Sequence, residues 1–441
     1  MSQSLTGNQT DRTSGGAPAM QRAAFASLIG TTIEWYDFYL FVFCSALVFS
    51  KVFFAATDPV SGYIGSVGTL VAAFLSRPLG ALAFGHFGDT KGRKIALVVT
   101  LVGMGIVTCA IGLVPGYASW GYWSVATLIG LRLLQGIFFG GEWGGAVLLT
   151  IENSPPQQRG WYGVFSQVGN PLGFFLASGV MQLIVVSTSL DDFLRWGWRI
   201  AFFASALLVL VGLYVRLVIA ETRDFQNLNK RKTIREALPI KLLLLRHWRT
   251  LLLCLILQSG LLFGSYMLIV YGANYSQRVL GMPANWNFIA GLVAASLSIL
   301  ALLVLARLSD RIGRKPIYMF GLLMYVIVPF PFYWLLEMKT LAGVIVANSL
   351  VWTLAQAGTT AVQSSFLAEL FPTEVRYSAI SISYQLSTVV IGIPVSFLPV
   401  WVMSQFGTIY AVAAFASIGG LLGLVALLPL PETYKKQIAE P

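Results

Sequence analysis

Twelve apolar blocks, each long enough to cross a membrane as a helix, limit the fold of this chain more than any other feature. About 20 helical residues span the roughly 30 Å of hydrocarbon in a bilayer. Lipid offers no hydrogen-bond partners, so a spanning segment has to pair its own backbone groups, as a helix does. The blocks cover residues 23–50, 62–84, 95–114, 120–150, 161–186, 198–219, 250–272, 286–306, 317–336, 341–368, 377–402 and 408–430. The sequence therefore predicts an all-α integral membrane protein with about twelve transmembrane helices.

The composition excludes a soluble domain of this length. Of the 441 residues, 56% are hydrophobic and 11% are charged, whereas roughly 25% are charged in typical soluble domains. A soluble chain would need far more polar surface to cover its core. The three cysteines, Cys44, Cys109 and Cys254, all fall within apolar blocks, so we expect neither a disulfide framework nor a metal cluster.

The basic residues are concentrated on one side of the expected membrane. Of the 29 lysines and arginines, 22 fall in the tails, in the connections after even-numbered blocks or at the block ends beside them, five fall in or beside the opposite connections, and two lie deep within blocks. Basic residues mark the cytoplasmic side of membrane proteins. We therefore expect a multi-pass protein of the bacterial cytoplasmic (inner) membrane with both termini in the cytoplasm. The net charge of +11 then reflects topology, and no nucleic-acid partner is expected.

A polar stretch in the middle of the chain separates two groups of six blocks. It carries Arg223, Lys230, Arg231, Lys232, Arg235, Lys241, Arg246 and Arg249, with amphipathic runs that include Ile234, Leu238 and Leu242. It is either a short helix lying on anionic headgroups or a solvated connection. The expected parts are a disordered cytoplasmic tail at 1–22, a six-helix half at 23–219, a cytoplasmic linker at 220–249, a second six-helix half at 250–430 and a cytoplasmic tail at 431–441. No cleavable signal peptide is expected before the first block.

The two halves repeat each other. GHFGDTKGRK (Gly85–Lys94) follows the second block and ARLSDRIGRK (Ala306–Lys315) follows the eighth, and their aspartates lie 221 positions apart. After the fourth block, Glu152, Pro155, Arg159 and Ser166 match Glu369, Pro372, Arg376 and Ser383, 217 positions later. Two motif pairs at nearly one offset indicate a duplicated six-helix unit, an architecture of transporters whose halves face each other across a central site.

At these residues the chain resembles the major facilitator superfamily and, within it, the metabolite:proton symporter family. The general motif is the loop after the second block, where members usually carry a basic residue after the aspartate and this chain has Thr90. The narrower motifs are EWYDFY (Glu34–Tyr39), RLLQG (Arg132–Gly136), GGEWGGA (Gly140–Ala146), GWRIAF (Gly197–Phe202), Glu221-Thr222 and FPTEVRYSA (Phe371–Ala379). The resemblance implies the fold of that superfamily, with two pseudo-symmetric six-helix halves.

The resemblance also implies a function. Known members of the family move shikimate, 2-oxoglutarate, citrate, or compatible solutes such as proline and betaine. We expect proton-coupled symport (uptake) of a small organic acid by alternating access, because osmosensing members often carry a long C-terminal coiled coil and only a short tail follows the last block here. The alternatives are uptake of zwitterionic osmolytes and drug or metabolite efflux by proton antiport. Gly169–Gly173 (GNPLG) is a partial likeness to the Gly-Pro motif of antiporters.

An enzyme is not expected. The sequence has no phosphate-binding Gly-x4-Gly-Lys-Ser/Thr loop and no nucleophile–base or metal set, so no cofactor is predicted. The expected partners are a small-molecule solute, protons and membrane lipid, and the protein is expected to be a monomer.

Five ionisable residues inside the apolar blocks of the first half are interpreted as functional. They are Glu34, Asp37, Arg77, Arg132 and Glu142. Each costs roughly 2.5–3.5 kcal/mol at the centre of a membrane helix, so each is expected to face a cavity or a partner. Helical rise places Glu34, Asp37 and Arg132 near the membrane midplane, where transporter sites are expected.

Glu34, Asp37 and Arg132 are expected to couple proton movement to transport. The two acids lie three residues apart on one helix face, and their mutual repulsion favours protonation of one of them. Arg132 would attract this pair or an anionic substrate, since its planar guanidinium suits two-point contact with a carboxylate. The alternative is a permanent Asp37–Arg132 ion pair that ties the first helix to the fourth. The two histidines, His86 and His247, lie outside the blocks, which leaves carboxylates to carry protons.

Substrate contacts are expected on the first, fourth, seventh and tenth spans, which line the cavity in the family. The predicted substrate-binding residues are Arg132, Tyr36, Tyr39, Gln135, Gln258, Tyr266, Trp352 and Gln356, with Tyr271, Asn348, Gln167, Asn170, Tyr384 and Gln385 as further candidates. Each also has a structural interpretation, because amides inside a span can link helices and aromatic residues near its ends can lie in the interface belt.

The repeated loops are expected to gate the cytoplasmic side. The predicted gating residues are Asp89, Arg93, Lys94, Asp310, Arg314, Arg77 and Glu142. Charge-assisted contacts at the helix ends can close that side and break when the halves move. A surface ion pair contributes only about 0–1 kcal/mol, so such contacts would exchange easily. Arg77 and Glu142 lie nearer the cytoplasm than the other buried charges and are expected to act as a gating or packing pair.

Overall fold

The computed structural model describes residues 16–54, 59–218 and 239–434, and the regular secondary structure in these ranges is helical. The long helices of the first half are α1 (Gly16–Cys44), α3 (Pro59–Lys91), α4 (Arg93–Leu113), α6 (Tyr122–Ile151), α8 (Phe165–Ser187) and α10 (Trp198–Val218). The short helices α2 (Ser50–Val52), α5 (Tyr117–Trp120), α7 (Arg159–Gly163) and α9 (Leu190–Asp192) lie at their ends.

Most spans of the second half are built from consecutive helical segments. These are α13 (Trp248–Leu257), α14 (Ser259–Phe263) and α15 (Tyr271–Asn274), then α16 (Ala284–Ile312), α17 (Arg314–Ile327) with α18 (Pro329–Glu337), α19 (Leu341–Leu350) with α20 (Ala357–Leu370), α21 (Arg376–Ser387) with α22 (Ile393–Phe406), and α23 (Ile409–Leu427). π-Helical turns at Gly264–Val270, Val351–Gln356 and Thr388–Gly392 interrupt three of the spans. Such turns are frequent at functional sites.

The number of helices agrees with the number of predicted spans. Within the described ranges, ten helical runs are long and apolar enough to cross a membrane, and α17 and α18, bent by 43°, form an eleventh. Pro329 explains the bend, because proline removes a backbone donor and crowds the preceding turn. The 33-residue α3 packs along α6 and makes the twelfth. The predicted fold class, an all-α membrane protein of about twelve helices, is confirmed.

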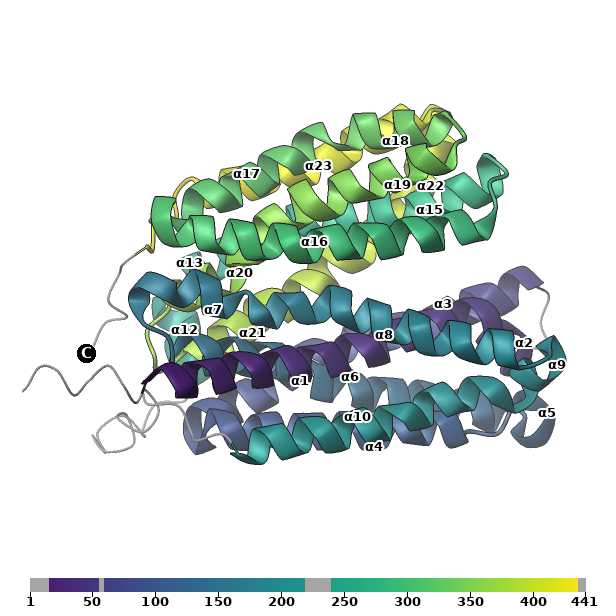
Figure 1. The fold of residues 1–441 in the computed structure, drawn as a ribbon, viewed down its shortest axis with the longest axis horizontal. Coiled ribbons are helices and arrows are strands. Elements are labelled where there is room, and N and C mark those ends of the chain that lie inside the picture. The colour runs from purple at the N-terminus through teal and green to yellow at the C-terminus, as the bar shows by residue number, and fades with distance from the viewer. Residues whose placement is uncertain (1–15, 55–58, 219–238, 435–441) are drawn as a thin grey trace, which may run out of the picture.

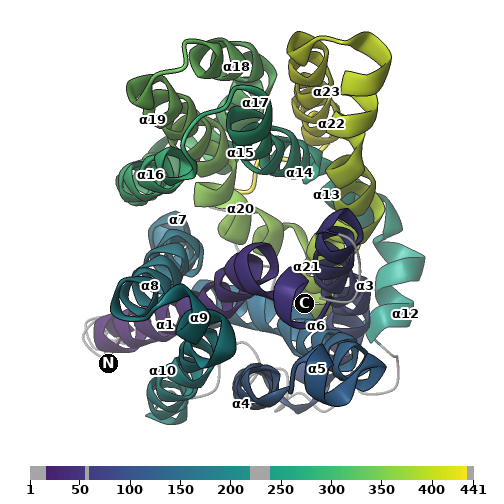
Figure 2. The same ribbon diagram turned by 90° about the vertical axis from the view of Figure 1, so that its right-hand side faces the viewer.

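The helices form two halves (Figure 1). The first half, in purple to teal, lies below the second half, in green to yellow. The helix α1 begins and α23 ends at the same end of the molecule, on the left of the view, which is termed the terminal end; the opposite end is the far end. Figure 2, viewed from the far end, shows α21 of the second half beside α3 of the first, against which it packs.

At the terminal end, α3 and α16 extend beyond the predicted spans by nearly two helical turns each. Each is followed by a glycine with positive φ, 118° at Gly92 and 108° at Gly313, a conformation that side chains disfavour. The next helix begins immediately after the glycine. Asp89 and Asp310 therefore lie on the last turns of long helices.

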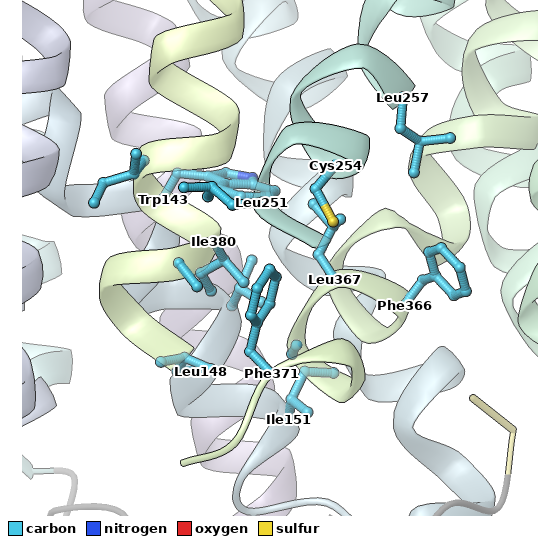
Figure 3. Close-up of a cluster of buried hydrophobic side chains, with 14 of the residues drawn as sticks. Trp143, Leu148, Ile151, Leu251, Cys254, Leu257, Phe366, Leu367, Phe371 and Ile380 are labelled. Carbon is cyan, nitrogen blue, oxygen red and sulfur yellow. The ribbon is translucent and has the colours of Figure 1, made fainter. Parts of the chain in front are cut away.

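A cluster of buried apolar side chains joins the halves near the terminal end (Figure 3). Trp143, Leu148 and Ile151 of α6 meet Leu251, Cys254 and Leu257 of α13, Phe366 and Leu367 of α20, and Phe371 and Ile380 beside them. Burying one such side chain away from water contributes roughly 1.5–3 kcal/mol. Opening this end to water is therefore costly.

The helix α12 (Pro239–Arg246) is a described part of the predicted linker. It packs against α3, α13 and α21, with Leu243 buried and Leu244 and Leu245 exposed. Exposed leucines next to basic residues are typical of a helix that lies on a membrane surface. The predictions for residues 1–15, 219–238 and 435–441 lie outside the described residues.

Candidate functional site

Asp37, on α1, is fully buried and held by two hydroxyl groups. Ser205 Oγ on α10 donates a 2.6 Å hydrogen bond to one carboxylate oxygen, and Thr108 Oγ1 on α4 donates a 2.8 Å hydrogen bond to the other. The exposed fraction of Asp37 is 0%. The hydroxyls replace hydration that the carboxylate loses on burial. Three helices of the first half thus position this acid.

A chain of hydrogen bonds runs from Asp37 to Arg132. Thr108 Oγ1 accepts a 2.8 Å hydrogen bond from Gln135 Nε2, and Gln135 Oε1 accepts one from Arg132 Nη1. Thr108 and Gln135 lie between Asp37 and Arg132. In the part of the chain that the structure describes, these two charges therefore form no direct ion pair. The alternative prediction of a permanent Asp37–Arg132 ion pair is therefore wrong.

The guanidinium of Arg132, on α6, lies over the ring of Phe41, with Cζ 3.5 Å from the ring centroid. Arg132 is 2% exposed. Its Nε and Nη2 are buried and have no hydrogen-bond partner in the described part of the chain. Open donors on a buried guanidinium attract carboxylates strongly, because a charge-assisted hydrogen bond is stronger than one between neutral groups.

Arg77, on α3, is enclosed by aromatic rings. Its Cζ lies 3.6 Å from the ring centroid of Phe139, 4.5 Å from that of Phe74 and 5.5 Å from that of Phe38. Arg77 and Arg132 line one small cavity between α1, α3, α4 and α6, of about 10 Å³. This volume is close to the least that holds one water molecule. The predicted gating residue Arg77 thus lies beside Arg132.

The other two acids predicted inside the spans of the first half differ in their partners. Glu142, on α6, forms a buried ion pair with Arg216 of α10 and accepts a 2.7 Å hydrogen bond from Thr100 of α4. Glu34 is 2% exposed, and its Oε2 has no hydrogen-bond partner among the described residues. It lies within electrostatic reach of Arg77, Glu142 and Arg216. The interpretation of Arg77 and Glu142 as a pair is wrong, because Arg216 takes that place.

Side chains of the two halves meet next to the buried charges described above. Trp143 of α6 stacks on Tyr384 of α21, with ring centroids 4.3 Å apart. Tyr384 and the predicted substrate residue Tyr266 lie within electrostatic reach of Arg77. Arg77 therefore lies where the first half faces the second.

A chain of amides and hydroxyls also crosses between the halves. Gln167 Nε2 on α8 donates to Ser364 Oγ on α20 at 2.9 Å, and it lies 3.4 Å from Gln363 Oε1. Gln363 Nε2 in turn donates to Gln258 Oε1 at 2.6 Å. In this structure the predicted substrate residue Gln258 links helices, which was its structural interpretation.

The tyrosines predicted on the first span bind within the first half. Tyr36 is fully buried, and its hydroxyl donates to the Ala201 carbonyl on α10 at 2.8 Å. The Tyr39 hydroxyl donates to Asn170 Oδ1 on α8 at 3.2 Å. Tyr36 thus binds α10, whereas Tyr39 contacts α8, which packs against α16 of the second half.

The residues predicted on the tenth span lie at the contact between the halves. The ring of Trp352 packs edge-on against Phe174 of α8, with centroids 5.9 Å apart. Gln356 Oε1 and both amide atoms of Gln385, on α21, are buried without a hydrogen-bond partner among the described residues. Buried polar atoms are usually satisfied, so these amides are available to water or to a solute.

Two of the predicted gating residues of the first half, Asp89 and Arg93, lie in a buried charge cluster. Arg93 Nη2 lies 3.5 Å from Asp89 Oδ1 and 3.4 Å from Glu152 Oε1. Arg376 of the second half reaches the same oxygen of Glu152 at 3.2 Å. These four residues are termed the first terminal cluster.

The repeat places an equivalent cluster in the second half. Arg314 Nη1 lies 2.6 Å from Asp310 Oδ1, and Arg314 Nε lies 3.6 Å from Glu369 Oε2. Arg159 of the first half reaches Glu369 Oε1 at 3.8 Å. These four residues are termed the second terminal cluster. Arg159 and Arg376 are themselves repeat equivalents, so each half supplies one arginine to the cluster of the other.

Each cluster aspartate also binds backbone of the opposite half. Asp89 Oδ2 accepts hydrogen bonds from Ser378 N at 3.2 Å and Ser378 Oγ at 2.8 Å. Asp310 accepts hydrogen bonds from Gly160 N at 3.0 Å and Trp161 N at 2.8 Å. Trp161 and Ser378 lie 217 positions apart, which continues the repeat.

The gating charges are buried, and the prediction of weak surface pairs is wrong. The exposed fraction of the side chain is 0% for both Arg93 and Arg314. Removing one partner from a buried charge pair typically costs about 3–5 kcal/mol, far more than a surface pair contributes. Lys94 differs, because its Nζ donates to the Leu217 carbonyl of the same half at 2.9 Å.

Sequence reasoning missed three residues of the site, Thr108, Ser205 and Arg216. Hydroxyls are common inside membrane helices and carry no distinguishing spacing. Arg216 falls inside the predicted span 198–219 but counted as one of the basic residues at its cytoplasmic end. Its place within an apolar block was the signal that could have marked it as a charge in need of a partner.

Comparison with known proteins adds the family. The sequence profile of the Major Facilitator Superfamily matches residues 28–393 and 289–440. The shikimate transporter of Escherichia coli (strain K12) is 34% identical over 417 residues, 94% of this chain and 95% of that protein. The inner membrane metabolite transport protein YhjE of the same organism is 36% identical, over 92% of this chain and 93% of that protein. The proline/betaine transporter of Salmonella typhimurium (strain LT2) is 32% identical, over 95% and 85%.

The similar solved structures show the fold. The proton:xylose symporter XylE bound to 6-bromo-6-deoxy-D-glucose has a TM-score of 0.79 at 16% identity, over 96% of this chain and 98% of that chain. The inward open conformation of XylE from E. coli has a TM-score of 0.68 at 19% identity, over 95% and 98%. With this fold and a shikimate transporter matching 94% of its length, the chain belongs to the major facilitator superfamily of membrane transporters.

Proposed function

We propose that this chain takes up a small organic acid together with protons, by alternating access. The observation that carries the proposal is the buried chain Asp37–Thr108–Gln135–Arg132. It joins an acid that can take up a proton to an arginine with open donors. Both lie deep in the apolar part of the first half, where charges are kept for function.

The chain links the protonation of Asp37 to the donors of Arg132. Charged Asp37 accepts hydrogen bonds from Ser205 and Thr108. A protonated carboxyl group becomes a donor at one oxygen, so one hydroxyl has to turn. Where the new proton points at Thr108 Oγ1, the Thr108 hydroxyl proton turns toward Gln135 and displaces its amide group. Gln135 then turns its Oε1 to accept that proton, which frees Arg132 Nη1, in addition to the open Nε and Nη2, for the carboxylate of the solute.

The charge balance sets the driving force. A monoanion that enters with one proton carries no net charge, so only the pH gradient drives its accumulation. Each additional proton adds about 2.3 kcal/mol per 100 mV of membrane potential.

The two terminal clusters act as the gate on the cytoplasmic side. The positive-inside pattern of the basic residues supports this orientation, with both tails in the cytoplasm of the bacterial inner membrane. Because each half supplies an arginine to the other, the clusters break together when the halves separate. The transporter works as a monomer, since one chain provides both halves.

The relatives support a carboxylate as the ligand. Shikimate, named for one relative, is a monocarboxylate, and it fits the open donors of Arg132. Proline and betaine, named for another relative, are zwitterions that also carry a carboxylate, so zwitterion uptake remains the alternative.

Substitution of Asp37 tests the proposal. Asp37→Asn keeps the size of the side chain and removes the titratable group. We expect proton-driven accumulation of labelled shikimate or 2-oxoglutarate in proteoliposomes to be lost, while counterflow exchange without a pH gradient stays measurable. Asp191→Asn, a matched change at an exposed acid of α9, is expected to accumulate solute like the wild type.

Unchanged accumulation by Asp37→Asn would remove Asp37 from the mechanism. An uncoupler distinguishes the direction of transport: it abolishes solute uptake into whole cells if the protein is a symporter. If the uncoupler instead increases the solute content of the cells, the protein is an antiporter that exports the solute.

A further inference from the structure

Arg77 is a second buried arginine, beside Arg132, and it takes no part in the hydrogen-bonded chain from Asp37 to Arg132. It is 5% exposed, and in the described part of the chain it forms no ion pair. Its Nε is buried without a hydrogen-bond partner there. The rings of Phe38, Phe74 and Phe139 stabilise the cation. They provide no hydrogen-bond acceptor of carboxylate strength.

Arg77 and Arg132 form the walls of the same cavity. Arg132 also has open donors, Nε and Nη2. Two guanidinium groups that share a low-dielectric space repel each other, and an anion between them removes that cost. The cavity is therefore built for negative charge.

We infer that Arg77 and Arg132 bind the solute together and thereby select organic anions over zwitterions. This inference rests on the proposed function and names the substrate class of its site. In proteins, quaternary ammonium groups bind against the faces of aromatic rings. Here the faces of Phe139 and Phe74 are covered by the Arg77 guanidinium, so the cation of a betaine would meet a second positive charge.

The second half can complete this anion site. Tyr266 and Tyr384 lie within electrostatic reach of Arg77, and a phenol hydroxyl is a hydrogen-bond donor. An anion held by Arg77 therefore interacts electrostatically with phenols of the second half. Binding of the acid then favours the closed arrangement, as alternating access requires.

Equilibrium binding to the purified, full-length protein tests the inference. The probes are shikimate, 2-oxoglutarate and glycine betaine. We expect the wild type to bind at least one of the two acids in preference to glycine betaine. In Arg77→Gln the affinity for the acid is expected to fall by about tenfold or more, the effect of losing one charge-assisted contact. The preference over glycine betaine shrinks in parallel.

Two further variants make the result specific. Arg77→Lys keeps the charge and is expected to keep the preference for anions, with weaker binding because the planar fork is lost. Arg307→Gln is the matched control, since Arg307 also lies over an aromatic ring, Trp161, at 4.0 Å, but is exposed at the terminal end. It is expected to bind like the wild type.

Chemical protection gives a readout that needs no variant to fold. Phenylglyoxal, which modifies arginine, reaches the buried Arg77 only when the halves open, so we expect slow labelling in the free wild-type protein and still slower labelling when the acid is bound. The inference is overturned by unprotected or absent labelling of Arg77, by wild-type affinity in Arg77→Gln, by equal binding of glycine betaine, or by failure to bind either acid. Binding requires no proton movement, so a wild type that binds acids through Arg77 without carrying protons refutes only the proposed function.

Discussion

Asp37 and Arg132 share one hydrogen-bonded chain without touching, and this separation suits a transporter. A direct buried ion pair would hold both charges in place, and breaking it would cost several kcal/mol. Thr108 and Gln135 are neutral, and each exchanges partners by rotating a side-chain torsion. The acid and the arginine therefore influence each other while each remains able to change its partner.

Removing the Thr108 hydroxyl should break the hydrogen-bonded chain from Asp37 to Arg132 and so uncouple proton movement from solute transport. Thr108→Val keeps the shape of the side chain but leaves Asp37 with one donor fewer and Gln135 without its acceptor. An unsatisfied buried group costs about 1–3 kcal/mol, so we expect proton-driven accumulation in proteoliposomes to fall by about tenfold or more. In the control Thr188→Val the lost hydroxyl contacts only Ile184 of its own helix, and transport is expected to be unchanged. Equal accumulation by the two variants would show that the chain is not a relay.

The residues of the site were predictable from the sequence only where charge marks them. Asp37 and Arg132 were found because charges are rare inside apolar blocks. Thr108 and Ser205 were not, because a hydroxyl inside a helix usually bonds to its own backbone, as Thr31 does. The pairing of Glu142 with Arg216 depends on how two distant helices are rotated, and sequence spacing does not contain that information.

Among the elements, α3 and α6 place both arginines of the cavity. A Cβ on Gly136 would lie 2.2 Å from the Ala73 carbonyl oxygen, and one on Gly140 would lie 2.1 Å from the Arg77 carbonyl oxygen. The two backbones therefore touch, in the small-xxx-small arrangement of packed membrane helices. This contact fixes Arg77 beside Arg132.

Adding one methyl group at this contact should separate the helices. In Gly140→Ala we expect a clearly lower Tm in detergent, because overpacking typically costs about 1–3 kcal/mol, and weaker binding of the acid. Gly130→Ala on the same helix is the matched control: nothing lies within 4 Å of its added Cβ, and alanine favours helix. A Tm for Gly140→Ala equal to that of Gly130→Ala would contradict the close contact.

The spans were predictable and their ends were not. Hydropathy marks where lipid surrounds a helix, and it recovers the helices because few charges interrupt the blocks. It ends α3 and α16 too early, because the residues beyond are polar yet still helical, and the opposite half buries the side chain of Asp89 among them. The same burial made the surface assumption for Asp89 and Arg93 wrong: the side chains that cover them come from distant segments such as Arg376 and Ser378.

For the whole molecule, the duplicated sequence produces a gate with two equivalent clusters. Glu152 holds Arg93 and Arg376, and Glu369 holds Arg314 and Arg159. Each glutamate therefore joins the two halves through arginines from both. Together with the apolar cluster beside them (Figure 3), they keep the terminal end closed in this structure.

Neutralising either glutamate should open the terminal end. Native Cys254, fully buried in the apolar cluster between the halves, reports opening by its labelling with a membrane-impermeant maleimide, once Cys44 and Cys109 are replaced by serine. Glu152→Gln and Glu369→Gln are each expected to speed this labelling, and the double variant to speed it most, because each change removes the charge of a carboxylate that two buried arginines share.

Glu337→Gln is the control for this experiment, since Glu337 pairs with Tyr410 at 2.7 Å and with no arginine among the described residues. Slow labelling in all variants would mean that the clusters do not hold the gate.

Direct measurement of proton entry is the sharpest test of the proposed symport. Wild-type protein in liposomes, with the voltage clamped and no initial pH gradient, is exposed to an inward gradient of shikimate or 2-oxoglutarate while a trapped dye reports lumen pH. The predicted result is acidification of the lumen with solute entry, and solute entry without acidification in Asp37→Asn. Solute entry with unchanged or rising lumen pH in the wild type, or acidification at the wild-type rate in Asp37→Asn, would contradict it.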